Sequence, residues 1–396
     1  MNDVGVAICL EHARVVHDDC IATQSLFFAN GRVAASARSV IHVDLRDHLV
    51  FPGLINAHDH LQLNSIPPLR HAAPFRNSYE WIAAFDAHFG DPEVATAVAV
   101  PVDVRHWNGA LKNVLAGVTT VAHHDPWRAV LDDAAFPVGL LRRFGWCHSL
   151  GLGLGEAGAA PSYGPAVRAS FVDTPSDAPW IIHLAEGTDD VAARELSQLE
   201  AMGCLATNTV LVHGTGLTSD DVLRVIASGA AVVWCPSSNV GMFGRTLDPR
   251  VLHDAGRLSL GSDSRLTGAR DLLGELAFAG QVSDLSSREL LRLVTGHASR
   301  ALRMPLCGGL AIGQQADCVI VRDSGDAYAS LVGIERSTIR AVVRGGVPVV
   351  ADPDFAEWFA ACGVETLPAK LDGVPKLIAA SVARPEAIVM EIGLER

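Results

Sequence analysis

The chain has 396 residues, 49% of them hydrophobic, so it can bury a large core as one big domain or two. Its 44 acidic and 31 basic residues give a formal net charge of −13, which repels nucleic-acid phosphates and anionic lipids. The composition therefore indicates a compact globular protein and excludes a nucleic-acid polymer as an expected partner.

Both ends of the chain are predicted to be β-structure. The first fifty residues alternate apolar and polar side chains over short runs, and Asn30-Gly31 within LFFANGRVAA is typical of a tight hairpin turn. Gly345-Gly346 within AVVRGGVPVV is a second hairpin signal near the other end. We expect the two terminal segments to meet in a small β-sandwich.

Between the ends, short apolar runs alternate with helical stretches. In chain order the runs are HLVFPGLINAH, GVTTVAHH, FPVGLLRRFGWCHSL, PWIIHLAE, TVLVHG, AAVVWCPSS and RLSLGSD. Such repetition indicates a parallel sheet, and seven or eight units over about 250 residues match a closed barrel better than an open doubly wound sheet. The predicted fold class is α/β, a (β/α)8 TIM-like barrel at residues 51–304, with residues 1–50 and 305–396 supplying the two parts of the sandwich.

Most of these runs end in side chains of metal-binding or catalytic type. The residues are His58, His60, His183, Glu186, His213 and Asp263. Because His58 and His60 are two apart on one predicted strand, they point to the same side, and strand ends of a parallel barrel open onto one face. Three imidazoles with one carboxylate suit Zn²⁺ or Fe²⁺, whereas Mg²⁺ and Ca²⁺ take oxygen ligands.

The same residues suggest a hydrolytic chemistry. A divalent ion with an open coordination position lowers the pKa of a bound water from about 16 toward about 7. Attack on a carbon–nitrogen bond also needs a proton shuttle, and Glu186, three residues after His183, is placed to provide it. Asp263 can both ligate the ion and accept a hydrogen bond from the water, and His213 can orient the water or polarise the group attacked.

The motifs PGLINAHDH, HLAEG, LVHG and GSDS, in this order, resemble the amidohydrolase superfamily, in particular its mononuclear cytosine/guanine deaminase and chlorohydrolase-like branch. GVTTV near residue 120, CPSSN at 235–239 and GGLAIGQQADCVIV after Gly308 extend the resemblance over nearly the whole chain. It implies one divalent metal, Zn²⁺ in preference to Fe²⁺, held by His58, His60, His183 and Asp263. It also implies that Glu186 is the proton shuttle and His213 the water-orienting histidine.

Two features separate this chain from some members of that superfamily. Its only lysines are Lys112, Lys370 and Lys376, which excludes the carbamylated lysine that typically bridges two metals after the fourth strand, while a bridging carboxylate or thiolate stays open. The segment GEAGAAPSYGPAVRASFVDTPSDA is also too short for the usual fourth strand and long helix. We expect a reduced fourth βα unit, either with a brief strand near Ala166–Val172 or without its helix.

Several further residues are candidates for contact with a substrate. Gln62, Ser238, Asn239 and Arg245 follow predicted strands and can hydrogen-bond a heterocycle, although polar loop residues are more commonly solvated. His123 and His124 receive no catalytic role, because packing explains them equally well. Trp81, Trp107 and Trp127 are expected to pack in the core.

The leading functional hypothesis is hydrolytic deamination of an aminated nitrogen heterocycle, by a hydrolase acting on carbon–nitrogen bonds other than peptide bonds. One alternative is hydrolysis of a cyclic amide, an N-alkyl amine or a ring halide by the same residues. A non-catalytic barrel scaffold is disfavoured, because scaffold relatives typically lose ligands and this chain has all of them.

The sequence also suggests where the protein works. No stretch reaches the roughly 18–20 apolar residues of a membrane helix, the N-terminus lacks a signal pattern, and the eight cysteines form no CxxC pair. We expect a cytoplasmic protein with a small-molecule substrate and no membrane partner. A homodimer is expected only because large barrels often form symmetric oligomers.

Overall fold

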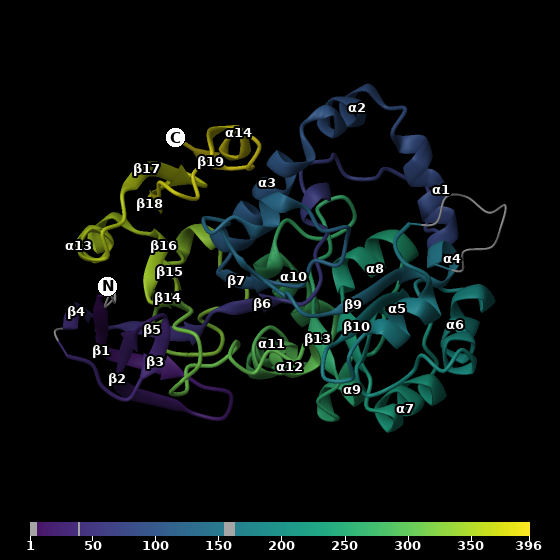
Figure 1. Ribbon diagram of the computed structural model, residues 1–396, viewed down its shortest axis with the longest axis horizontal. Helices are drawn as coiled ribbons and strands as arrows, with labels where there is room; N and C mark the ends of the chain where they lie inside the picture. The colour runs from purple at the N-terminus through teal and green to yellow at the C-terminus, as the bar shows by residue number, and fades with distance from the viewer. Residues whose placement is uncertain (1–5, 39, 154–162) are drawn as a thin grey trace.

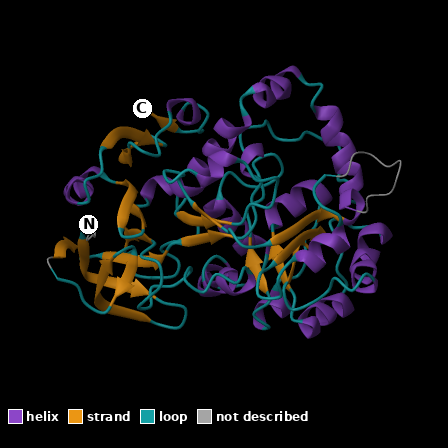
Figure 2. Cartoon of the chain, viewed as in Figure 1, coloured by secondary structure: helices purple, strands orange, loops and turns teal. Residues whose placement is uncertain are grey.

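The computed structural model describes residues 6–38, 40–153 and 163–396. Strands from both ends of the chain gather on one side of the molecule, where the N- and C-termini also lie (Figure 1). Alternating strands and helices from the middle of the chain fill the other side (Figure 2). The chain thus separates in space into a terminal sheet and a central α/β part.

The terminal sheet has eleven strands within the described residues. Its path is β19-β17-β18-β16-β15-β14-β5-β1-β2-β3, and β4 pairs with β1. The strands are β1 (Ala7–Val16), β2 (Ile21–Ala29), β3 (Arg32–Ala34), β4 (Val40–Asp44), β5 (His48–Pro52), β14 (Cys318–Arg322), β15 (Ala341–Arg344), β16 (Val347–Ala351), β17 (Thr366–Leu371), β18 (Val374–Ala379) and β19 (Leu394–Glu395).

Both expected hairpins are present. Asn30 and Gly31 have φ of 52° and 72° and connect β2 to β3, while Gly345 and Gly346 have φ of 57° and 82° and connect β15 to β16. Positive φ at both central residues is the requirement of a tight hairpin turn, which explains these dipeptides. The two ends meet where β14 pairs antiparallel with β5, from Cys318 opposite Pro52 to Arg322 opposite His48. Strand pairing thus joins both termini in one sheet.

Eight short parallel strands form the central part. They are β6 (Leu54–Asn56), β7 (Val118–Val121), β8 (Gly139–Leu140), β9 (Gly145–Ser149), β10 (Trp180–Leu184), β11 (Thr209–His213), β12 (Ala231–Trp234) and β13 (Leu258–Leu260). Pairing among described residues gives the orders β6-β7-β8 and β13-β12-β11-β10-β9. The Ala57 N–H donates to the Leu260 carbonyl at 3.1 Å, so the two groups also meet between β6 and β13. The arrangement is TIM-barrel-like.

Most of the helices surround these strands, while the helix at residues 356–361 packs against β16 and β4 of the terminal sheet. The helices are α1 (Ser78–His88), α2 (Pro92–Ala99), α3 (Val102–Leu115), α4 (Leu150–Gly153), α5 (Val167–Asp173), α6 (Asp190–Ala201), α7 (Ser219–Ser228), α8 (Pro236–Phe243), α9 (Arg250–Asp254), α10 (Leu272–Val282), α11 (Ser287–Leu293), α12 (Gly296–Ala301), α13 (Ala356–Ala361) and α14 (Pro385–Ile388). Local signals set their ends: α7 begins with a capping box between Thr218 and Asp221 and ends at Gly229, whose φ is 78°. Within the described chain, every helix is too short or too polar to cross a lipid bilayer.

The region of the fourth strand differs from one of our two expectations. Residues Val167–Asp173 form helix α5, so a strand at 166–172 is wrong. The side chains repeat at helical spacing: Val167 is buried, and Phe171, four residues on, packs edge-to-face against Trp180 at 5.2 Å. The run FPVGLLRRFGWCHSL instead supplies two strands, β8 and β9, separated by four residues without a helix. Residues 154–162 of the short segment lie outside the described residues.

Candidate metal centre

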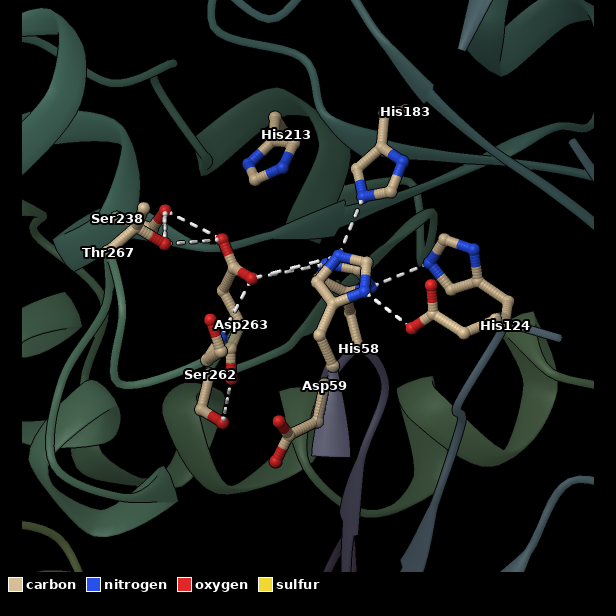
Figure 3. Close-up of polar contacts among 12 residues, drawn as sticks. His58, Asp59, His124, His183, His213, Ser238, Ser262, Asp263 and Thr267 are labelled. Atoms are coloured by element: carbon tan, nitrogen blue, oxygen red, sulfur yellow. Dashed lines mark hydrogen bonds and ion pairs between the residues drawn. The ribbon is translucent and has the colours of Figure 1, made fainter. Parts of the chain in front are cut away.

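The six predicted polar residues come together at the C-terminal ends of the central strands. His60 Nε2 lies 3.3 Å from His183 Nε2, and Asp263 Oδ1 lies 3.7 Å from His58 Nε2. Figure 3 shows the His58 and His183 rings and the Asp263 carboxylate facing a common point, with His213 close by. Residues spread over more than 200 positions of sequence therefore share one buried site.

The donor atoms fit a divalent metal. Two triads, His58–His183–His213 and His58–His60–Asp263, each bring their ligand atoms within 4.8 Å of one another. Both triads include His58, whose Nε2 is buried and has no hydrogen-bond partner among the described residues. An unpartnered buried imidazole nitrogen beside two further imidazoles and a carboxylate is the donor set that Zn²⁺ prefers.

The backbone at this site is strained. Ala185, His213 and Asp263 have φ of 52°, 76° and 52°, in the left-handed region that side chains other than glycine seldom adopt. Each such residue costs about 1–3 kcal/mol and persists only where the surrounding structure imposes it. All three follow or end a central strand, so these strained residues lie where the strands end beside the site.

A second group of residues orients the histidines. Asp125 Oδ2 lies 2.7 Å from His60 Nδ1, the His148 carbonyl 2.7 Å from His183 Nδ1, and Asn239 Oδ1 2.8 Å from His213 Nδ1. His124 Nε2 lies 2.8 Å from His58 Nδ1. Each contact occupies Nδ1 and leaves Nε2 directed at the centre, the usual arrangement around metal-binding histidines.

Sequence reasoning assigned no role to Asp125 or His124. The only sequence signal for His124 and Asp125 was that they follow a predicted strand, as the six predicted site residues do. That position did not distinguish residues of the site from residues that simply pack in the core. The Asp263 carboxylate is oriented in the same way, because the Ser238 and Thr267 hydroxyls donate to its Oδ2 at 2.8 and 3.0 Å (Figure 3).

The protonation of the site follows from burial and from these partners. Burial lowers the pKa of His58, lowers that of His183 well below its usual value, and lowers that of His213 to about 4. Burial also disfavours the charged form of His60, but the Asp125 carboxylate outweighs it and raises the pKa of His60 to about 9. Burial opposes ionisation of Asp263, yet the surrounding imidazoles hold its pKa well below 3.8. His58, His183 and His213 are therefore in the neutral form that binds a metal, whereas His60 has to release its proton to Asp125 or to solvent when a metal binds.

Glu186 is buried beside the donor atoms. Its Oε1 accepts a hydrogen bond from the Trp81 indole at 2.8 Å and lies 3.6 Å from His213 Nε2. Burial and the Asp263 carboxylate raise the pKa of Glu186 well above 4.5, against the effect of the indole N–H. Core packing is therefore wrong for Trp81, whose polar edge faces the site; Trp107 is buried as expected, and Trp127 is exposed.

A cavity of about 450 Å³ opens from the site beneath α1 and α2. Its wall includes His60, His183, His213 and Asp263 at one end, and Ile66, Phe85, Phe89, Val98 and Leu266 elsewhere. This volume is typical of a small-molecule site. Gln62 also lines the cavity.

The other three candidates for substrate contact are bonded to protein groups. Ser238 and Asn239 are fully buried against Asp263 and His213, and Arg245 donates to the Thr215 carbonyl at 3.3 Å. Among described residues, none of these three belongs to the cavity wall. Ser238 and Asn239 lie in α8, the helix that follows β12, and their side chains contact Asp263 and His213 from behind; Arg245 follows the end of that helix.

Comparisons with known proteins agree with this architecture. Residues 169–349 match the model of the amidohydrolase family. The 5-methylthioadenosine/S-adenosylhomocysteine deaminase of Pyrococcus furiosus is 22% identical over 80% of this chain and 85% of its own. These matches support the amidohydrolase superfamily for this chain.

One further curated relative and one solved structure are also similar to this chain. The deaminase of the same name from Pyrococcus abyssi is 27% identical over 183 residues, which are 42% of each chain, and the match spans about two fifths of that curated relative. The crystal structure of a zinc-bound adenosine deaminase from Xanthomonas campestris superposes with a TM-score of 0.68 at 19% identity, over 91% of this chain and 97% of that one. The latter shows a shared fold.

Proposed function

We propose that this protein is a metal-dependent hydrolase that deaminates an aminated nitrogen heterocycle. The observation that carries the proposal is the position of Glu186, a buried carboxyl of raised pKa beside a convergent set of three imidazoles and one carboxylate. The deaminase names of the relatives support the reaction class.

The proposed ligands are His58, His60, His183 and Asp263, for one ion, with Zn²⁺ preferred over Fe²⁺. When bound, the ion supplies Lewis acidity and lowers the pKa of water at the site. The zinc in the related adenosine deaminase structure supports this choice. Asp125 and the His148 carbonyl hold the rings of His60 and His183 in the required tautomer.

The chain's own residues would move the protons. Glu186 takes a proton from water as the oxygen adds to the ring carbon, and delivers it to the ring or the departing amine. His213, fixed by Asn239, hydrogen-bonds the oxygen that becomes the product carbonyl. Overall one water is consumed, one carbon–oxygen bond forms, one carbon–nitrogen bond breaks and ammonia leaves.

Finer features of the architecture remain proposals. We propose that β6 to β13 are the eight strands of one (β/α)8 barrel whose third unit has no helix, since β8 and β9 are four residues apart. The proposed domains are residues 1–50 and 305–396 for the terminal β-structure and 51–304 for the barrel. A cytoplasmic location is supported by eight cysteines without a disulfide, and a homodimer rests on the base rate alone.

Metal analysis of the purified protein, with an ammonia-release screen over aminated pyrimidines, purines, pterins and triazines, tests the function. We expect about one metal per chain and ammonia from one ring class. Metal without ammonia would favour the cyclic amide, N-alkyl amine or ring halide alternative. No metal binding even after reconstitution would contradict the enzyme proposal and favour the scaffold.

A further inference from the structure

One charged side chain in the cavity wall has no role in the chemistry above. Arg105 lies in the first turn of α3, is 9% exposed, and lines the same cavity as His60, His183 and Asp263. Within the described chain it forms no ion pair at 4.0 Å or less. Burial lowers the pKa of its guanidinium, which nevertheless stays charged at neutral pH.

Arg105 is held in place by backbone carbonyls. Its Nε donates to the Val100 carbonyl at 3.1 Å and its Nη1 to the Gln62 carbonyl at 2.7 Å. These bonds fix the guanidinium plane but supply no counter-charge. Among described residues Nη2 has no acceptor, so its two N–H groups and one on Nη1 stay available to a ligand. A largely buried cation without a counter-ion is costly, which points to a partner that arrives from outside.

The acids of the cavity wall do not provide that partner. Asp125 is bound to His60 and Tyr163, and Asp263 to the site hydroxyls. Asp86 is exposed and forms no ion pair in the described structure. Gln62 contributes its backbone carbonyl, which holds Arg105, while its side-chain Oε1 is a buried acceptor and does not bind an anion. The guanidinium of Arg105 therefore faces the cavity with unused donors.

We propose that Arg105, held by the Gln62 and Val100 carbonyls, forms a subsite that binds a carboxylate on the substrate, while its aminated ring lies at the candidate metal centre. This rests on the proposed function and narrows the substrate class to heterocycles with an anionic substituent. One guanidinium matches the single charge of a carboxylate, and the nearby Asp86 and net charge of −13 disfavour a dianion such as phosphate. The apolar side chains of Phe85, Val98 and Ile66 suit a hydrocarbon link between the two ends.

A pair of matched probes tests the subsite. They are adenines with an N9-carboxyalkyl chain of two to four carbons and the corresponding carboxamides. Binding is measured by calorimetry to the metal-loaded Glu186→Gln protein, and turnover by ammonia release from the wild type. We expect the carboxylate to bind about 10- to 100-fold more tightly than its carboxamide at the best chain length.

Substitutions at Arg105 separate recognition from folding. Arg105→Met in the Glu186→Gln background should abolish the preference for carboxylate, and Arg105→Lys should restore part of it. Arg128→Met is the matched control, because this exposed arginine pairs with Asp103 in the same turn of α3. The control should keep the full carboxylate-to-carboxamide ratio.

The outcomes distinguish the two proposals. If the wild type releases ammonia equally well from carboxylate and carboxamide, and Arg105→Met lowers both alike, the subsite is overturned and the deaminase function stands. If no probe yields ammonia but the carboxylate binds with an Arg105-dependent preference, the subsite stands and deamination of adenines is contradicted; the deaminase function itself is contradicted only if the screen over the other ring classes also yields no ammonia. A preference retained in Arg105→Met would also overturn the subsite.

Discussion

Two regions of the molecule bury charged groups, and they do so in opposite ways. Where the C-terminal segment packs on the barrel, Glu391 receives Arg265 at 2.8 Å and Arg336 at 2.5 Å, so its charge is fully paired. At the ends of the central strands, His58 Nε2 has no partner among described residues, and Asp263 Oδ1 is 3.7 Å away. The charges of the first region are satisfied by its own ion pairs, while the second region presents converging donor atoms that fit a divalent metal.

The backbone at the strand ends is strained as well. Ala185, His213 and Asp263 adopt positive φ without being glycine. Positive φ also occurs at other residues than glycine in the terminal sheet, at Asn30 and Asp372, so strain alone does not separate the two regions. The candidate metal centre differs in that its strained residues lie beside a buried nitrogen, His58 Nε2, without a partner in the described chain.

Removing the carboxyl of Glu186 should produce the largest effect on activity. We expect Glu186→Gln to lower kcat roughly 10³- to 10⁴-fold, because proton transfer to the leaving nitrogen is lost. Metal content should not change. Glu200→Gln, an exposed acid on α6, is the control. Steady-state kinetics and metal analysis of Glu186→Gln test this prediction. Near-normal turnover would refute the assignment of Glu186 as the proton shuttle.

Breaking the paired region should affect stability instead. Glu391→Gln leaves Arg265 and Arg336 buried against a neutral amide, and we expect the unfolding free energy to fall by about 3–4 kcal/mol. Denaturant unfolding of metal-loaded protein measures this. The exposed Glu386→Gln on α14 should change it by less than about 0.5 kcal/mol. If Glu391→Gln lost metal but kept its unfolding free energy, Glu391 would serve the metal centre and not stability, which would contradict the proposed difference between the two regions.

Asp125 is the carboxylate that orients His60, one of the proposed metal ligands. Asp125→Asn removes the carboxylate that orients His60, and we expect metal affinity to weaken about 10- to 100-fold. Competition with a chelating dye gives the affinity, and exposed Asp132→Asn is the control. Unchanged affinity would mean that His60 needs no orienting partner or is not a ligand.

The smallest effect concerns pH. Burial raises the pKa of Glu275 from 4.5 to about 7, so the folded state binds this proton more tightly than the unfolded state. Its contribution to stability is present below about pH 4.5 and is lost as pH rises toward 7. Between pH 5 and 8, we expect the unfolding free energy of Glu275→Gln to decrease less than that of the wild type, by about 1 kcal/mol. Parallel pH profiles would contradict this.

Much of the site could be predicted from the chain alone. His58, His60, His183, Glu186, His213 and Asp263 each follow an apolar run, and parallel strands must bring such ends to one face. The hairpins at Asn30-Gly31 and Gly345-Gly346 were equally readable, because only residues that tolerate positive φ fit there. These are local rules, and they hold whatever surrounds the segment.

Other features were not readable in the sequence. The run FPVGLLRRFGWCHSL contains two strands, β8 and β9. The four residues between them include no glycine or proline, so the sequence gives no signal that the first strand ends there. For the short segment before β10 we expected either a brief strand or a missing helix, and the strand alternative is wrong because Val167 and Phe171 pack as a helix. Trp81 was expected in the core, since nothing local indicates that its indole meets Glu186.

The sequence by itself determined the kind of fold and which side chains end its strands, because periodicity and turn chemistry are encoded within a few residues. Only the tertiary structure decided which of those side chains have partners. Asp125 meets His60 across 65 positions, Ser238 meets Asp263 across 25, and Arg105 meets no carboxylate in the described chain. Satisfaction of a buried polar group depends on everything packed around it, and that is a property of the folded molecule.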